Sequence, residues 1–155
     1  MTQESAITGE MRAAINVESE PNVNEVEKGA IIKFARAIGD SNPLFTDEEA
    51  ARNSRYGGLI APPTFLRSLS PGPLKAQVKS PYPANLDGGS EWQYFEPVRA
   101  GDQITVTTYV SDMSEREGRL GNMLFIVRET KYVNQFDQTV ALQRSTGISY
   151  QPESD

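Results

Sequence analysis

The sequence contains no cysteine and no histidine, and these two absences narrow its chemistry. Without cysteine, the chain forms no disulfide, offers no thiolate to zinc and has no cysteine nucleophile, which suits a reducing compartment. Without histidine, it builds neither a Ser-His-Asp triad nor an imidazole metal site from its own residues. Histidine-dependent chemistry would therefore need a second polypeptide.

Long apolar runs and a positive net charge are also lacking. With 155 residues, of which 37% are hydrophobic and 23% charged, the composition is typical of one globular domain. The net charge of −6 disfavours nucleic acid as a partner. The polar start, MTQESAITGEMR, lacks the apolar segment of a signal peptide. We therefore expect a cytoplasmic protein that binds neither nucleic acid nor a membrane.

Acidic residues are missing from one interval, residues 50–86, although the chain has 21 of them. Five basic residues give this interval a charge of +5, whereas the other ten basic and 21 acidic residues leave −11 elsewhere. Six of the ten prolines also lie here. The five basic residues are Arg52, Arg55, Arg67, Lys75 and Lys79.

Helices are expected in the first half of the chain. Residues 26–38 place apolar side chains at i, i+3, i+4 and i+7 from Ile31, which predicts one apolar helical stripe. Gly39 ends this helix, and Pro43 forbids its continuation. A second, short helix is expected at 47–52, where the acidic start complements the helix dipole and favours a helix terminus over a metal site.

Antiparallel strands are expected in the second half, after a short helix ending near Leu69 and a proline-rich loop. The segment 123–127 is apolar at every position, which indicates that both sheet faces are covered, one by the helix and one by a second subunit. The pattern predicts an α+β fold in which a curved sheet wraps one buried helix. The expected strands are 91–95, 103–111, 120–133 and 139–150, with hairpin connections at 114–118 and 134–138.

Three motifs, taken in order, resemble those of the MaoC-like hydratase/dehydratase family, and in particular its amino-terminal MaoC-like dehydratase branch. They are FARAIGDSNPLFTD at 34–47, YGGLIAPPTF at 56–65 and PVRAGD at 97–102. The resemblance implies a hot-dog fold, with a long central helix in a bun of antiparallel strands, usually paired with a second hot dog. It also implies an enoyl or 3-hydroxyacyl thioester of coenzyme A or acyl carrier protein as ligand, in fatty acid or steroid side-chain metabolism, and no further cofactor.

The domain boundaries follow from the extent of this resemblance, which covers roughly residues 26–150. Residues 1–24 are expected to form a flexible segment with at most a short strand near 15–17. Residues 25–151 form a single hot-dog domain, and residues 152–155 a tail.

The resemblance further implies a reaction, in which an Asp and a His five residues apart hold the water that is added across a double bond. Asp40 stands at the Asp position, but Phe45 stands at the His position. The resemblance also implies a backbone N–H that polarises the thioester carbonyl, and Pro63 stands at the position that would supply it. Proline has no backbone N–H, so this donor is missing unless the alignment shifts by one residue to Thr64. The chain is therefore similar to the non-catalytic halves of heteromeric hydratases, in which a His-containing hot-dog partner supplies the catalytic pair.

Several candidate residues also have structural explanations. Asp40 and Asn42 are typical turn formers, and Ile60 or Phe65 would equally fill a core. The basic residues of the interval 50–86 would bind coenzyme A phosphates or lie on a solvated loop. The candidate substrate-binding residues are Asp40, Asn42, Phe45, Ile60, Ala61, Pro62, Pro63 and Phe65.

The leading hypothesis is a subunit that shapes the substrate pocket. Because it lacks the catalytic motif, its helix and loops can move apart and admit bulky acyl groups. One alternative is a stand-alone thioesterase or hydratase that uses Asp40 as its base, since a fold does not decide the reaction. Another is a non-enzymatic acyl-thioester binder. The sequence also leaves open a homodimer of the isolated chain.

Overall fold

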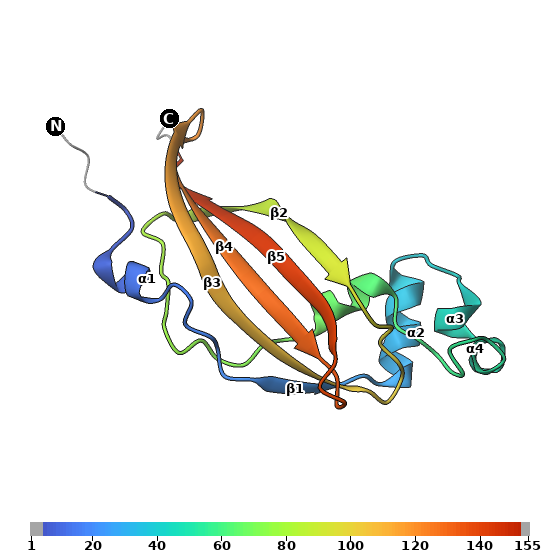
Figure 1. Cartoon of the computed structure of the whole chain (residues 1–155). Coiled ribbons are helices and arrows are strands. Elements are labelled where there is room, and N and C mark those ends of the chain that lie inside the picture. Colours follow the sequence, from blue (N-terminus) through green and yellow to red (C-terminus); the bar gives the residue numbers. More distant parts are fainter. Residues whose placement is uncertain (1–4, 153–155) are drawn as a thin grey trace.

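A five-stranded antiparallel sheet forms the frame of the molecule, with the strand order β1-β3-β4-β5-β2. The computed structural model describes residues 5–152. Figure 1 shows a curved sheet with helices gathered at one end and a short helix near the opposite end. The strands are β1 (Asn22–Glu25), β2 (Ala84–Tyr94), β3 (Gln103–Gly118), β4 (Gly121–Val133) and β5 (Thr139–Tyr150). The helices are α1 (Gly9–Ala13), α2 (Lys28–Ala37), α3 (Pro43–Thr46), α4 (Glu48–Arg52) and the 3-10 helix η1 (Pro63–Ser68).

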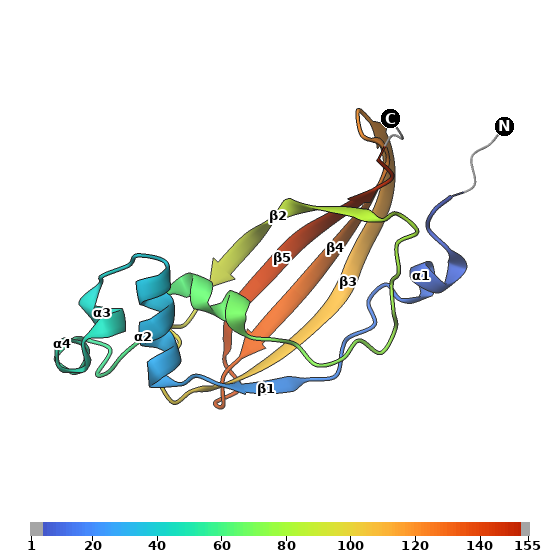
Figure 2. The ribbon, with the colours of Figure 1, turned by 180° about the vertical axis from the view of Figure 1, so that it is seen from behind.

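Helix α2 confirms most of the predicted apolar stripe: Ile31 and Ala35 are fully buried and Phe34 packs against the core, whereas Ile38, just beyond the helix, is 50% exposed. The helix ends as expected at Gly39, whose φ of +72° suits a residue without a Cβ. With ten residues, α2 lies at one end of the sheet, and η1 lies beside it on the same face (Figure 2). Among residues 5–152, none of the helices is long and apolar enough to cross a membrane.

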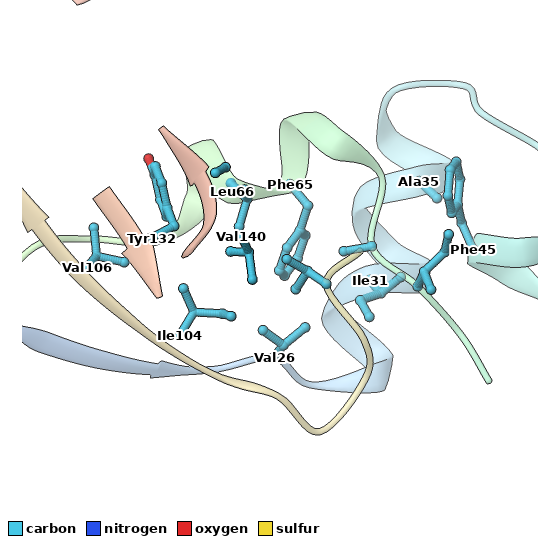
Figure 3. Close-up of a cluster of buried hydrophobic side chains, with 14 residues drawn as sticks. Val26, Ile31, Ala35, Phe45, Phe65, Leu66, Ile104, Val106, Tyr132 and Val140 are labelled. Atoms are coloured by element: carbon cyan, nitrogen blue, oxygen red, sulfur yellow. The ribbon is translucent and has the colours of Figure 1, made fainter. Parts of the chain in front are cut away.

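The main core lies between this sheet face and the two helices α2 and η1. Strand β3 alternates here, because Ile104 and Val106 are buried while Thr105 between them is only half-buried. Figure 3 shows Phe65 and Leu66 of η1 lying opposite Val140. The sheet and the helices that cover one face confirm the predicted α+β hot-dog class.

A second core lies at the far end of the same sheet face, where the expectation for the N-terminal segment differs from the structure. Residues 5–24 are packed: Ile7 and Met11 are buried against Val110 and Leu124. Their apolar side chains are spaced too irregularly for a clear periodic signal, and they become ordered by contact with the sheet. Residues 1–4 of the expected flexible segment, and 153–155 of the expected tail, lie outside the described residues.

Strand β2 is longer than expected, because its proline-flanked and glycine-containing start pairs with β5. The register of this pair shifts between Asp87 and Ser90, at a bulge. A Cβ at Gly88 would lie 2.8 Å from the carbonyl oxygen of Thr146, so this close approach requires glycine. Strand β3 likewise runs through 114–118, the region predicted to be a hairpin connection, and reverses only after Gly118.

The apolar segment 123–127 is covered on one face by this chain. Leu124 and Ile126 are buried in the second core. Phe125 and Val127, which point to the opposite face, are half-buried. Coverage of that second face by another subunit stays a prediction.

Candidate functional site

An apolar pocket of about 350 Å³ lies where α3, the start of η1 and the end of β2 meet. Its walls come from three separate parts of the chain, which the sheet and the short helices bring together. We call it the apolar pocket. The residues that line it are Phe45, Arg55, Tyr56, Ile60, Ala61, Pro62, Pro63, Leu66, Tyr94, Phe95, Glu96, Pro97 and Val98.

Phe45 occupies the position where the resemblance requires a catalytic histidine. Asn42 caps α3, because its Oδ1 accepts the backbone N–H of Leu44 at 3.0 Å, and Pro43 begins the helix. The helix directs the Phe45 ring into the main core, near Ala35 of α2 (Figure 3), and leaves it 7% exposed at the pocket wall. A phenyl ring neither takes up nor releases a proton, so Phe45 provides no acid or base; the one carboxylate among the residues that line the pocket is the exposed Glu96.

Asp40 does not line the apolar pocket, although it keeps the residue type that the resemblance expects. Its Oδ1 accepts the backbone N–H of Asn42 at 3.0 Å, which stabilises the turn between α2 and α3. Asn42 itself is exposed and serves as the cap of α3. Both residues therefore act in the structure as turn formers.

The second motif supplies the other wall of the apolar pocket. Ile60, Ala61 and Pro62 are buried and line it. Pro63, the first residue of η1, also lines it but has no backbone N–H to donate to a carbonyl. Thr64, the alternative donor, is exposed and does not line the pocket.

Phe65 differs from the other candidates of this motif, because it belongs to the main core and does not line the pocket. Its ring lies edge-on to that of Phe34, with the ring centroids 5.5 Å apart.

Aromatic side chains at the end of β2 form part of the pocket that the sequence did not reveal. Tyr94 is 45% exposed and Phe95 54% exposed, and both line the pocket. Trp92 stacks on Tyr94, with parallel rings whose centroids lie 5.6 Å apart. The only sequence signal is the alternation of Trp92 and Tyr94 in this strand, which is typical of packing or interface residues.

Tyr132 lies behind this aromatic stack, with its ring 5.6 Å from that of Trp92. Burial, and to a smaller extent the nearby Tyr94, raise the pKa of Tyr132 to about 12, while Arg67 opposes this rise. Tyr132 therefore stays protonated at neutral pH, and its hydroxyl contacts Oε1 of Gln143 at 3.4 Å. It is a core residue rather than a proton carrier.

The five basic residues of the interval 50–86 do not gather at one place. Arg55 lines the apolar pocket, where it donates to the hydroxyl of Tyr56 at 2.6 Å. Arg52 lies on α4 beside a different pocket. Lys75 pairs with Glu20 at 3.4 Å, and neither Arg67 nor Lys79 lines either pocket. The structure therefore does not bring all five to one pocket, and their binding of coenzyme A phosphates stays a prediction.

A larger hollow, of about 450 Å³, lies on the opposite face of the sheet. One ion pair lies in it: Glu129 accepts a hydrogen bond from Tyr109 and lies 3.7 Å from Arg144. Such a mixture of charged and polar side chains is typical of a solvated sheet face.

Comparisons with known proteins agree with this geometry. A UPF0336 protein from Streptomyces avermitilis is 37% identical over 99 residues, which are 61% of this chain and 66% of the relative. The ChsH1-ChsH2 complex from Mycobacterium tuberculosis contains a chain with a TM-score of 0.75 and 22% identity, over 89% of this chain and 86% of that one. The HadBC (3R-hydroxyacyl-ACP dehydratase) complex from the same organism gives a TM-score of 0.69 and 22% identity, over 88% and 99%.

A family profile covers most of the chain. The FAS1-like, dehydratase domain region family matches residues 13–143, which include Asp40, Phe45 and all three motifs. Together with the hot-dog fold of MaoC-like dehydratases, this match confirms the resemblance found in the sequence. The chain belongs to the FAS1-like dehydratase domain family of MaoC-like hot-dog proteins.

Proposed function

We propose that this chain is the non-catalytic, substrate-shaping subunit of a heteromeric enoyl-thioester hydratase or 3-hydroxyacyl-thioester dehydratase. The observation that carries the proposal is the pair Phe45 and Pro63 on the walls of the apolar pocket. The first removes the proton carrier, and the second removes the backbone donor for the thioester carbonyl.

The chemistry of hydration supports a second subunit. Adding water to an enoyl thioester requires a base that takes a proton from water and an acid that delivers a proton to carbon. The chain has no histidine, and the carboxylate of Asp40 accepts a backbone N–H outside the pocket. A partner hot dog would supply the Asp and His, while this chain would hold the acyl group.

The rim of the apolar pocket supports the same assembly. Strand β2 pairs only with β5 within the described residues, so one edge of this 11-residue strand is open. The exposed Tyr94 and Phe95 lie at the end of that edge and line the pocket. A partner that covers these rings would close the pocket and bury its apolar wall.

The solved structures lend further support, since the ChsH1-ChsH2 and HadBC structures are each described as a complex. Pairing with a histidine-containing hot dog is thus our proposal for this chain as well. The candidate substrate contacts would be Phe45, Ile60, Ala61, Pro62 and Pro63, all of which line the pocket.

The test measures hydration of short and bulky enoyl-CoA substrates by the purified chain, alone and with the hot-dog subunit that co-purifies from its host. We expect no hydration by the chain alone and turnover by the complex. Equal activity of the isolated chain would overturn the proposal.

Two variants test the role of the pocket rim. Phe95→Glu should abolish association with the partner, whereas Val23→Glu, at an exposed position of β1 on the other sheet edge, should leave it intact. Association of both variants like the wild type would contradict a partner at the pocket rim. Release of free CoA by the isolated chain would instead indicate the thioesterase.

A further inference from the structure

The turn between β4 and β5 presents the most exposed large apolar side chain of residues 5–152. Phe136, at the centre of residues 134–138, is 71% exposed. We call this segment the β4–β5 turn. It lies at the same end of the sheet as α2 and the end of β2 (Figure 1). A single exposed apolar residue is common on protein surfaces, so its exposure alone indicates no partner.

A buried asparagine holds the β4–β5 turn in one conformation. Asn134 is 7% exposed, and its Oδ1 accepts the backbone N–H groups of Phe136 at 3.0 Å and Gln138 at 3.1 Å. Its own backbone N–H donates to the carbonyl oxygen of Gln138 at 2.9 Å. Asp137 has a φ of +59°, a left-handed conformation that aspartate tolerates. Phe136 therefore stands on a preorganised backbone, which loses little conformational freedom when a partner binds.

The β4–β5 turn is also tied to the segment that precedes β3. The side chain of Gln135 donates to Oδ1 of the buried Asp102 at 2.9 Å and accepts the backbone N–H of Gln103 at 3.0 Å. The other carboxylate oxygen of Asp102 accepts the backbone N–H of Arg99 at 2.8 Å. Arg99 in turn forms a β-bridge with Ile60, on the wall of the apolar pocket. The position of the turn is therefore fixed relative to that wall.

The β4–β5 turn borders the rim of the apolar pocket. Phe136 lines a small hollow, of about 130 Å³, together with Glu96 and Pro97. Glu96 and Pro97 also line the apolar pocket, and they directly follow the exposed Phe95. The backbone N–H of Phe95 donates to the carbonyl oxygen of Val140, just after the turn, at 2.9 Å. A partner that covers Phe95 therefore comes within reach of Phe136.

Negative charge flanks Phe136. Glu96 and Asp137 are exposed, and within residues 5–152 neither forms an ion pair. Arg99 also lines the small hollow, but its Nη1 donates to the carbonyl oxygen of Tyr56. A surface that receives Phe136 would therefore be favoured by basic side chains around an apolar socket.

We propose that the β4–β5 turn is a docking element for the histidine-containing hot-dog partner, with Phe136 as its anchor and Glu96 and Asp137 as its charged border. The partner offers an apolar socket bordered by lysine or arginine side chains. Aromatic side chains are enriched in the buried centres of protein interfaces, where a few residues carry most of the binding energy. The identity of the partner rests on the proposed function, whereas the docking element consists of residues of this chain.

The test measures, by calorimetry, how tightly the full chain binds the purified histidine-containing hot-dog subunit that co-purifies from its host. Phe136→Ser should weaken binding by about tenfold or more, because it removes the anchor. Leu120→Ser is the matched control and should bind like the wild type. Leu120 is 41% exposed in the turn between β3 and β4, at the opposite end of the sheet (Figure 1). Both variants should keep the wild-type melting temperature, since both side chains are exposed.

A double variant tests the charged border. Glu96→Gln with Asp137→Asn removes both charges, and asparagine also tolerates the left-handed conformation at position 137. Association with the partner should slow by about threefold or more at low salt and depend less on salt concentration. An unchanged dependence on salt would overturn the basic border of the socket.

Equal affinities of Phe136→Ser and Leu120→Ser for the partner would overturn the docking element alone. Failure of the wild type to bind any histidine-containing hot-dog subunit would overturn it as well. Sedimentation of the isolated chain detects a second copy as the occupant: self-association that Phe136→Ser abolishes would also contradict the proposal. Hydration by the isolated chain, measured separately, is the result that overturns the proposed function.

Discussion

Phe45 and Asp40 lie five residues apart, yet only Phe45 lines the apolar pocket, while the carboxylate of Asp40 accepts the backbone N–H of Asn42. The turn between α2 and α3 thus keeps its geometry without a catalytic pair. A phenyl ring at this position adds apolar surface to the pocket and to the main core. The same residue therefore supports the fold and removes the proton carrier from this chain.

The burial of Phe45 makes it a stability determinant. Phe45→Ala should lower the free energy of unfolding by about 3 to 5 kcal/mol, since it leaves a cavity in the main core. Phe95→Ala is the control on the same pocket, and at 54% exposure it should cost less than about 1 kcal/mol. Urea denaturation of both variants measures the difference, and equal losses would contradict the burial of Phe45.

Two substitutions of Asp40 distinguish a role in the turn from a role as catalytic base. Asp40→Asn keeps an oxygen that accepts the Asn42 N–H, so the free energy of unfolding should change by less than about 0.5 kcal/mol. The rate at which the complex hydrates its substrate should be unchanged. Asp40→Ala loses the bond and should cost about 1 kcal/mol. A large drop in turnover with Asp40→Asn at unchanged stability would instead make Asp40 a base.

Tyr132 should make stability fall at high pH. Its pKa is raised to about 12 by burial, from the ordinary value of 10.0, so the unfolded chain loses this proton first. The native state holds more protons between these two values, and stability therefore decreases as pH rises from 10.0 to about 12. The loss attributed to Tyr132 is on the order of 2 kcal/mol. Denaturation of the wild type and Tyr132→Phe across this range checks it, and parallel curves would disprove it.

The second core predicts a cost for truncating Met11, which is 3% exposed. Met11→Ala should destabilise the protein by about 2 to 4 kcal/mol, because it removes packing against the sheet. Val23→Ala, at 61% exposure, is the control and should stay within about 0.5 kcal/mol. If the N-terminal segment were flexible, neither substitution would lower the stability of the protein. Thermal unfolding of both variants therefore distinguishes a packed segment from a flexible one.

Periodic segments were predictable because their signal is local. The helix around Ile31 was found to within two residues at its start, and β5 at both ends, since the spacing of apolar side chains matches the geometry of each element. The start of β2 was not found, because glycine and proline favour loops until pairing with β5 overrides that preference. Helix α1 is ordered chiefly by the second core, which residues far along the chain provide.

The sequence by itself determined what chemistry the chain lacks, because the absence of histidine and the residues Phe45 and Pro63 are properties of the side chains and the imide nitrogen alone. Only the tertiary structure decided which groups meet. Arg99 reaches the carbonyl of Tyr56 across 43 positions, and the rings at the end of β2 reach the wall formed by Pro62. Such proximities depend on strand register and on turns that bring distant segments together, which no local pattern encodes.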